Sequence, residues 1–295
     1  MSPGSKLRQL FSQPGAFIMP GAPNALTARI IQEAGFKVVL FTGAGFANTE
    51  LAVPDLGLMT MSEVVQQVGR ITEAVEIPVI ADADTGYGNP LNVWRTVREL
   101  ERAGAAGIII EDQTWPKRCG HFEGKQVIDR EEMIAKVKAA VDARRDQDTV
   151  IIARTDARAV FGIQEAIERA RAYAEAGADA TFVEAPRTVE ELELIPRSIP
   201  VPQMANMVEG GKTPVLPLNR LEAMGFKLIA YANAALRGAI KGMQIVLSGL
   251  ARDGTTEDVL DYMVTWEERQ RLVRLEEYKA LETRYVVPTP ERARG

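Results

Sequence analysis

The chain has 295 residues, of which 46% are hydrophobic, and its formal net charge at pH 7 is −5. Such a chain holds one large domain or two ordinary ones, and its acidic balance argues against a general nucleic-acid binder, which would carry a basic surplus. The single cysteine fits a reducing compartment, and no stretch reaches the roughly 18 apolar residues of a membrane span, so we expect a soluble cytoplasmic protein without a membrane partner.

Short apolar runs alternate along the chain with longer segments of helical periodicity. We predict strands at Ala16–Pro20, Lys37–Thr42, Ile77–Ala81, Gly107–Glu111, Thr149–Arg154, Ala180–Glu184, Pro202–Asn206 and Phe226–Tyr231. We predict helices at 24–34, 62–76, 90–103, 130–145, 163–176, 188–196, 218–224 and 233–251. Apolar runs such as Ile108–Ile110 do not alternate in polarity, which is typical of parallel strands that are buried on both faces.

Two segments, 102–111 and 175–184, are near copies of each other. Each reads as a helix end, a glycine turn, a strand and a final glutamate. Repeated strand–helix units in a chain of this length predict a (β/α)₈ barrel of the TIM type. A doubly wound open sheet is the alternative, but the strand–helix joins lack a Gly-x-Gly-x-x-Gly phosphate loop. Because no linker divides the chain, we expect a single barrel domain over 1–295.

The pattern changes beyond about residue 252 to a charged helical tail, Glu257–Arg284. Its apolar positions are Leu260, Met263, Leu272, Leu275 and Leu281. Such apolar surface outside a closed barrel indicates contact with a partner subunit. We therefore expect the tail, about 253–288, to serve oligomerisation.

Polar residues follow almost every predicted strand at its carboxyl end, where barrel enzymes place their active sites. Helix capping explains Asp and Asn at such positions, but it does not require Glu or Arg. The sequence therefore predicts a functional site formed by this rim, with these members: Thr42, Gly43, Asp82, Asp84, Glu111, Asp112, Arg154, Asp156, Glu184, Asn206 and Asn233.

Asp82 and Asp84 are two positions apart, so both carboxylates lie on one side of an extended strand. Two like charges so close repel each other, and a divalent cation removes the conflict. Asp55 and Glu111 could add further oxygen ligands. A site of oxygen ligands without histidine or thiolate suits Mg²⁺ or Mn²⁺ rather than zinc. The alternative is a solvated acidic rim with no metal.

Two arginines are candidate anion-binding residues. Arg154 ends a strand that we expect to be buried, and its planar guanidinium suits a carboxylate or phosphate partner, either Glu184 or a substrate. Arg237 lies on the last predicted barrel helix, where an ordinary surface arginine is the alternative interpretation.

The only cysteine and the only histidine of the chain, Cys119 and His121, are two positions apart. Lys117 and Arg118 precede them, and this positive charge is expected to stabilise the thiolate and so lower the pKa of the thiol. Gly120 between them would allow a tight backbone turn. The alternative is that Cys119 is a small buried apolar residue.

The segment Glu111-Asp112-Gln113, followed by 116–121, resembles the signature of the isocitrate lyase and phosphoenolpyruvate mutase superfamily. The similarity covers nearly the whole chain, with further matches at 54–57, 82–88, 153–156, 183–185 and 205–214. The Lys-Arg-Cys-Gly-His segment marks the carbon–carbon lyase branch, which includes 2-methylisocitrate lyases, 2,3-dimethylmalate lyases and the petal death protein.

This resemblance implies a barrel whose last helix is exchanged between paired subunits, commonly in a homotetramer. It also implies Mg²⁺ that Asp82 holds directly and that Asp55, Asp84 and Glu111 hold largely through water. The loop that carries Cys119 would close over the ligand as a lid. The implied substrate contacts are Thr42, Gly43, Ala44, Gly120, Arg154, Glu184, Asn206 and Arg237.

The implied reaction is a retro-aldol cleavage of a 2-hydroxy carboxylate into a 2-oxo acid, pyruvate or glyoxylate, and a carboxylate carbanion. Cys119 would protonate the carbanion as a general acid, and His121 would orient the loop. Cationic groups would stabilise the carbanion. The implied catalytic residues are Lys117, Arg118, Cys119, His121 and Glu111, with Arg237 beside them.

One departure from the family pattern bears on the substrate. Methylisocitrate lyases carry an arginine three residues after the methionine that matches Met263, and here that residue is Trp266. An indole in place of a cation favours an alkyl-substituted malate, such as 2,3-dimethylmalate, over a tricarboxylate. The alternatives are 2-methylisocitrate, a carboxyphosphonoenolpyruvate mutase, an oxaloacetate-acting enzyme and a non-catalytic metabolite-binding barrel.

Overall fold

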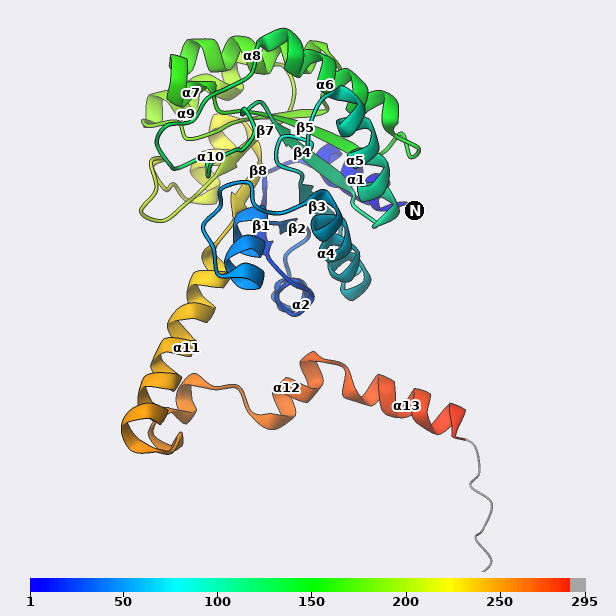
Figure 1. Ribbon diagram of the computed structural model, residues 1–295, viewed down its shortest axis with the longest axis vertical. Coiled ribbons are helices and arrows are strands. Elements are labelled where there is room, and N and C mark those ends of the chain that lie inside the picture. The colour runs from blue at the N-terminus through cyan, green and yellow to red at the C-terminus, as the bar shows by residue number, and fades with distance from the viewer. Residues whose placement is uncertain (287–295) are drawn as a thin grey trace, which may run out of the picture. The chain divides into compact units, whose positions relative to one another are not determined.

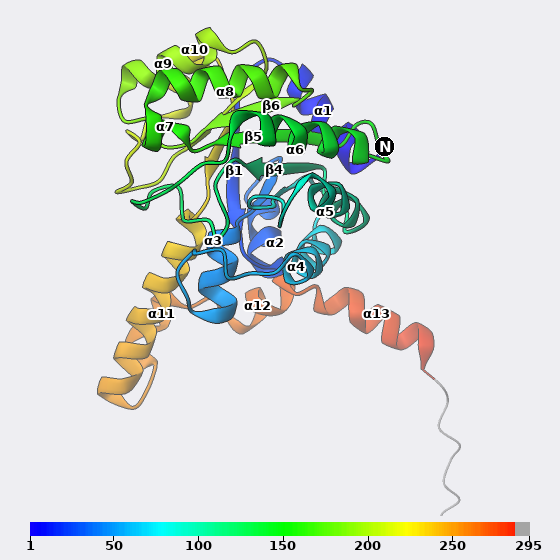
Figure 2. The ribbon, with the colours of Figure 1, turned by 45° about the horizontal axis from the view of Figure 1, so that its top comes forward.

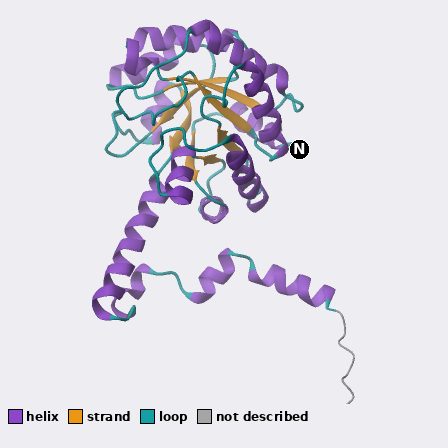
Figure 3. Ribbon diagram, in the orientation of Figure 1, coloured by secondary structure: helices purple, strands orange, loops and turns teal. Residues whose placement is uncertain are grey.

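The computed structural model describes residues 1–286. Eight parallel strands form a closed barrel in sequence order, with β8 paired to β1. Helices surround the strands, as Figures 1 and 3 show. The predicted (β/α)₈ barrel is therefore confirmed. Its strands are β1 (Phe17–Ala22), β2 (Val39–Phe41), β3 (Val79–Asp82), β4 (Gly107–Glu111), β5 (Val150–Thr155), β6 (Ala180–Val183), β7 (Gln203–Asn206) and β8 (Phe226–Tyr231).

The helices that follow the strands lie close to the predicted ranges. Their bounds are α2 (Ala25–Glu33), α4 (Met61–Ala74), α5 (Pro90–Arg102), α6 (Arg130–Ala143), α8 (Ile163–Glu175), α9 (Val189–Ser198), α10 (Leu218–Met224) and α11 (Ala234–Asp253). Helices α4, α5, α6 and α8 are seen on the outside of the barrel in Figure 2. Thr60 and Glu63 form a capping box at the start of α4, which explains its sharp beginning.

The near-copy segments have the same structure. Helices α5 and α8 each end before a glycine, Gly104 or Gly177, with φ of +89° and +107°. Only glycine adopts such angles without strain, so both turns depend on it. Each turn leads into a strand that has a glutamate at its carboxyl end: Glu111 is the last residue of β4, and Glu184 follows β6.

Apolar side chains fill the barrel in two layers. Alternate strand residues such as Leu40, Ile80 and Ile152 point into one central cluster, while neighbours such as Phe41 and Ile151 pack against the outer helices. This arrangement explains the strands' continuous apolar runs, since both faces of each strand are buried.

Four helical segments were not predicted: α1 (Pro3–Ser12), α3 (Gly43–Phe46), the π-helical η1 (Ala47–Leu51) and α7 (Ala157–Phe161). Helix α1 is part of the core, because Leu7 is fully buried in the central cluster. A Cβ on Gly4 would lie 2.5 Å from the Asp148 carbonyl carbon, so α1 packs directly on the backbone before β5.

The chain divides into two compact units, 1–238 and 239–295. The second contains the rest of α11, then η2 (Glu257–Tyr262), α12 (Trp266–Leu272) and α13 (Leu275–Tyr285). Of its predicted apolar positions, Leu260, Met263 and Leu281 are exposed, whereas Leu272 is buried. Among residues 1–286, no helix has both the length and the apolar character needed to cross a membrane.

Candidate active site

An ion-pair cluster is formed by residues that follow or end strands β2, β3 and β4. The Lys117 ammonium is 2.6 Å from Asp55 Oδ1 and 2.8 Å from Asp84 Oδ1. Asp82 Oδ1 accepts a hydrogen bond from the Asp84 N–H at 3.1 Å. The structure thus brings together three of the predicted metal-binding acids, with Lys117 between two of them.

The loop after β2 closes one side of this cluster. A Cβ on Gly43 would lie 3.2 Å from Asp82 Oδ2 and 3.5 Å from Asp84 Oδ1, so the glycine backbone contacts the carboxylates directly. Thr42 is buried, and its hydroxyl accepts the Gly45 N–H at 3.2 Å, which caps α3. Ala44 is half-buried beside them. Capping therefore accounts for part of what Thr42 does.

Because these carboxyl groups are buried, their ionised forms are disfavoured unless a cation lies close to them. Burial raises the pKa of Asp84 to about 6, partly opposed by Lys117. The pKa of Glu111 also rises well above its ordinary value through burial, although Arg154 and Lys117 oppose the shift. Burial alone would lower the pKa of Lys117, but Asp84 and the other acids raise it well above its ordinary value.

The donor set suits a hard cation bound mostly through water. Within residues 1–286 no three acidic, histidine or cysteine side chains converge as a direct ligand set. Glu111 Oε1 is nevertheless buried without a hydrogen-bond partner in this part of the chain. Mg²⁺ typically keeps several waters and uses one or two carboxylates, so Asp82, Asp84, Asp55 and Glu111 fit that ion through their oxygen chemistry.

Arg154 is the centre of a second, adjoining network. Its Nε lies 3.2 Å from Glu111 Oε2 and 2.9 Å from Asp156 Oδ2. Its Nη2 lies 3.7 Å from Glu184 Oε2. The arginine thus links three strand ends, β4, β5 and β6. The sequence predicted Glu184 as its possible partner but gave Asp156 no separate role, although the two-residue spacing from Arg154 places them on one side of the chain.

Asp112, next to Glu111 in the sequence, binds the backbone of Asp156 and so holds part of this network in place. Its carboxylate accepts hydrogen bonds from the Asp156 N–H at 2.9 Å, the Thr155 hydroxyl at 2.7 Å and the Tyr173 hydroxyl at 2.8 Å. Arg169 adds an ion pair at 3.2 Å. A fully buried carboxylate needs these donors, since an unsatisfied buried charge is costly.

Tyr173→Phe should therefore destabilise the protein. We expect a loss of about 1–3 kcal/mol in the free energy of unfolding, because the change removes one donor from a buried carboxylate. Chemical denaturation monitored by circular dichroism measures this loss. The exposed Tyr278→Phe is the control and should change stability by less than about 0.5 kcal/mol. Equal stabilities of the two variants would contradict this account of Asp112.

The loop that carries Cys119 packs directly on Arg154 and Glu184. A Cβ on Gly120 would lie 2.5 Å from Glu184 Cδ and 2.6 Å from Arg154 Nη2, so no other residue fits there. The predicted tight turn is present, since the Phe122 N–H donates to the Cys119 carbonyl at 2.8 Å. The φ of Gly120 is not among the positive values of the described chain, so the close approach rather than the turn is what requires glycine. The Cys119 N–H donates to the Asp55 carbonyl at 3.1 Å, which ties the loop to the acid cluster.

The expected lowering of the thiol pKa is wrong. Burial raises the pKa of Cys119, and the charges of Asp55 and Glu184 add to this effect. Lys117 instead faces the acid cluster, and Arg118 is exposed, with its backbone bonded to the Gln113 side chain. A thiol with a raised pKa stays protonated at neutral pH and can therefore donate a proton.

His121 connects the loop to two other parts of the barrel. Its Nδ1 accepts the Lys212 N–H at 3.1 Å, and its Nε2 lies 3.2 Å from Glu184 Oε1. An accepting Nδ1 places the proton of the neutral ring on Nε2. Burial lowers the pKa of His121, which favours this neutral form.

The remaining predicted residues lie in different surroundings. Asn206 is at the end of β7, and its Oδ1 is buried without a hydrogen-bond partner among residues 1–286. Arg237 is exposed and bonds to the Glu209 carbonyl at 2.7 Å and its carboxylate at 3.3 Å. Trp266 belongs to the second unit, where Arg269 stacks on its ring at 4.1 Å. Its role in substrate binding stays a prediction.

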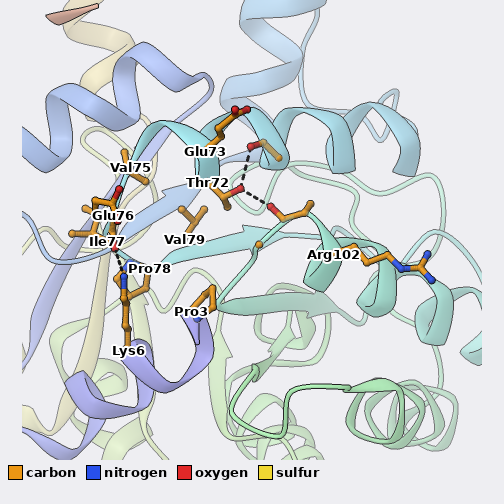
Figure 4. Close-up of a pocket in the computed structure, with 13 residues that line it drawn as sticks. Pro3, Lys6, Thr72, Glu73, Val75, Glu76, Ile77, Pro78, Val79 and Arg102 are labelled. Carbon is orange, nitrogen blue, oxygen red and sulfur yellow. Dashed lines mark hydrogen bonds between the residues drawn. The ribbon is translucent and has the colours of Figure 1, made fainter. Parts of the chain in front are cut away.

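Two pockets mark opposite ends of the barrel. A cavity of about 40 Å³ at the carboxyl ends is lined by Thr42, Asp82, Arg154, Asn206, Leu40, Ile109, Phe182, Met204 and Ala232. A pocket of about 420 Å³ lies at the amino ends, around Lys6, Glu73, Glu76 and Arg102 (Figure 4). There, Lys6 donates to the Glu76 carbonyl at 2.9 Å. Of these two, the first has an apolar floor and includes Thr42, Asp82, Arg154 and Asn206 of the predicted rim, so it is the candidate active site.

The chain is similar to known proteins over nearly its whole length. The family model described as phosphoenolpyruvate phosphomutase matches residues 7–251. A 2,3-dimethylmalate lyase of Eubacterium barkeri is 47% identical and covers 97% of this chain and 99% of its own. A 2-methylisocitrate lyase of Aeropyrum pernix is 44% identical and covers 94% of this chain and 89% of its own.

Solved structures give the same result. A crystal structure of 2,3-dimethylmalate lyase has a TM-score of 0.91 at 36% identity, covering 96% of this chain and 95% of that one. An oxaloacetate acetylhydrolase bound to 3,3-difluorooxalacetate has a TM-score of 0.91 at 34% identity, covering 96% of both chains. A phosphonopyruvate hydrolase, solved with oxalate and Mg²⁺, has a TM-score of 0.86 at 34% identity, covering 97% and 99%. The chain therefore belongs to the phosphoenolpyruvate phosphomutase family, as a carbon–carbon lyase of the isocitrate lyase and phosphoenolpyruvate mutase superfamily.

Proposed function

We propose that this enzyme is a Mg²⁺-dependent lyase that cleaves the C2–C3 bond of an alkyl-substituted 2-hydroxy dicarboxylate. The preferred substrate is 2,3-dimethylmalate, which would give pyruvate and propionate. The main supporting observation is the packing of Gly120, the residue next to Cys119, against Arg154 and Glu184. The 47% identity to a 2,3-dimethylmalate lyase supports the substrate class.

The lining of the candidate cavity supports a substrate with a small apolar group. Its volume of about 40 Å³ and its floor of Leu40, Ile109 and Phe182 accommodate a methyl-sized group. Arg154 would bind the substrate carboxylate through its guanidinium. Asn206, with its unpartnered Oδ1, and Thr42 would contact the oxygen on C2. Gly43 and Ala44 would contribute backbone N–H groups.

Proton movements in the reaction are assigned to residues of this chain. The hydroxyl proton passes to a carboxylate, for which Glu111 is the candidate. The C2–C3 electron pair moves to C3. The Cys119 thiol then protonates C3, so one proton leaves and one is added. His121 holds the loop through Lys212 and Glu184 rather than acting as the acid.

Asp82, Asp84, Asp55 and Glu111 would hold Mg²⁺, with Mn²⁺ as a possible substitute. When bound, the ion would polarise the substrate oxygens and stabilise the negative charge that develops as the bond breaks. Lys117 would then balance the remaining charge of Asp55 and Asp84.

We also propose a homotetramer in which C-terminal helices are exchanged between subunits, in the cytoplasm. The exposed side chains of Leu260, Met263, Trp266 and Leu281 support a subunit contact, because so much apolar surface is costly in water. A groove of about 640 Å³ in the second unit, around Leu260 and Trp266, adds to this surface.

One assay tests both the reaction and the metal requirement. We expect 2-oxo acid release from 2,3-dimethylmalate with Mg²⁺, and loss of nearly all turnover after treatment with a chelator, restored by added Mg²⁺. The panel includes 2-methylisocitrate, oxaloacetate and a carboxyphosphonate substrate. Preferential cleavage of oxaloacetate would favour a second candidate function, that of an oxaloacetate-acting enzyme, which the similarity to an oxaloacetate acetylhydrolase supports. Phosphonate turnover alone, or turnover unaffected by chelation, would contradict the proposal.

A further inference from the structure

A second lysine of the Cys119 loop, Lys125, is buried and makes two contacts outside the acid cluster. Its Nζ is 2.7 Å from Asp156 Oδ1, and it also donates a short hydrogen bond to the Gly120 carbonyl. The side chain is only 1% exposed, and Asp156 is fully buried. No pattern in the sequence singles out Lys125.

The partners of Lys125 explain what this contact does. Asp156 is fixed by two hydrogen bonds from Arg154, at 2.9 Å and 3.1 Å, and by its backbone N–H to Asp112. Gly120 packs against Arg154 and Glu184 with no space for a side chain. Lys125 therefore joins the Gly120 part of the loop to a fully buried carboxylate that Arg154 also holds.

We propose that Lys125 is a positioning residue of the Cys119 loop, which holds Gly120 and therefore the adjacent Cys119 against the Arg154–Glu184 pair. A buried ion pair is suited to this task, because removing one partner leaves the other charge buried and uncompensated. The same loop has buried ion pairs between Lys117 and the acids Asp55 and Asp84. Its pair between Glu123 and Lys212 differs, because Glu123 is 83% exposed and such surface pairs contribute little. The expected effect of Lys125 on catalysis rests on the proposed function, whereas its expected effect on the position of the loop does not.

The single thiol of the chain allows a direct test. Cys119 is the only cysteine, so the rate of alkylation by iodoacetamide, followed by mass spectrometry, reports access to the loop without any substrate. We expect Lys125→Met to increase this rate about tenfold or more, because loss of the buried contact favours local opening. The matched control Glu123→Gln, on the same loop, should stay within about twofold of the wild type. A thermal unfolding transition of each variant confirms that the barrel is folded.

Two outcomes would overturn the proposal: unchanged alkylation in Lys125→Met, or equal acceleration in Glu123→Gln. If Lys125→Met does not fold, Asp156→Asn carries the same test, since it is nearly isosteric and removes the charge that attracts Lys125. In the lyase assay, Lys125→Met should lower kcat with little change in KM, as expected for a misplaced proton donor. A wild type without lyase activity would remove the proposed function, whereas the alkylation result would still decide the role of Lys125.

Discussion

Replacement of Cys119 by alanine is expected to lower kcat for the lyase reaction by about 10²–10⁴-fold, the usual contribution of a positioned general acid. The thiol is half-buried beside Gly120, and its raised pKa keeps it protonated. Alanine removes the proton donor and leaves the loop contacts of Gly120 and His121 in place. KM should change little, because the thiol acts after the substrate has bound.

Steady-state kinetics of 2-oxo acid release measure this effect. Cys119→Ser is the matched variant, because it replaces the thiol with a hydroxyl of similar size that donates a proton less readily. It should retain more activity than Cys119→Ala. Both variants should unfold at the temperature of the wild type. Full activity in Cys119→Ala would exclude the cysteine as the acid and leave the loop with a purely steric role.

Replacement of Arg154 by glutamine should affect both stability and activity. Arg154 is the shared cation of Glu111, Asp156 and Glu184. Their buried carboxylates would lose their main partner, and breaking a buried ion pair in this way costs about 3–5 kcal/mol. We expect a fall of this size in the free energy of unfolding, measured by urea denaturation, together with loss of detectable turnover.

Arg197→Gln provides the control for this experiment. Arg197 pairs with Glu193 on the surface of α9, with its side chain 71% exposed, so its loss should cost about 0.5 kcal/mol or less. A similar cost for the two variants would mean that the carboxylates around Arg154 are stabilised by other groups. Arg154→Lys should not restore activity, since an ammonium cannot reproduce the forked contacts to Asp156.

The fold was predictable because its signals are local. Strands such as β3, β4 and β5 begin with continuous apolar runs, and glycines such as Gly104 and Gly177 mark the ends of helices that precede strands. Helix α1 was missed because its burial depends on the barrel end: Leu7 reaches the central cluster only when the distant β3 and β5 are assembled. A ten-residue segment has no pattern that reveals such a contact.

The candidate site was predictable as a set of positions but not as a set of contacts. The rim residues could be read from the strand ends, and the Cys119 segment from its rare residue types. The direction in which each side chain points could not be read. Lys117 and Arg118 are adjacent in the sequence, yet one is buried among acids and the other is exposed, which is why the expected effect on the thiol pKa failed. The role of Lys125 could not be predicted, because Lys125 lies in the loop after β4 whereas its partner Asp156 follows β5.

The position of Lys117 between Asp55 and Asp84 has a consequence for how the polypeptide reaches its native state. Small zinc domains gather like-charged ligands that only an external ion can neutralise, so their folding waits for the ion. Here the chain supplies an internal counter-charge to the mouth of the barrel. The barrel could therefore fold first and bind the proposed Mg²⁺ afterwards.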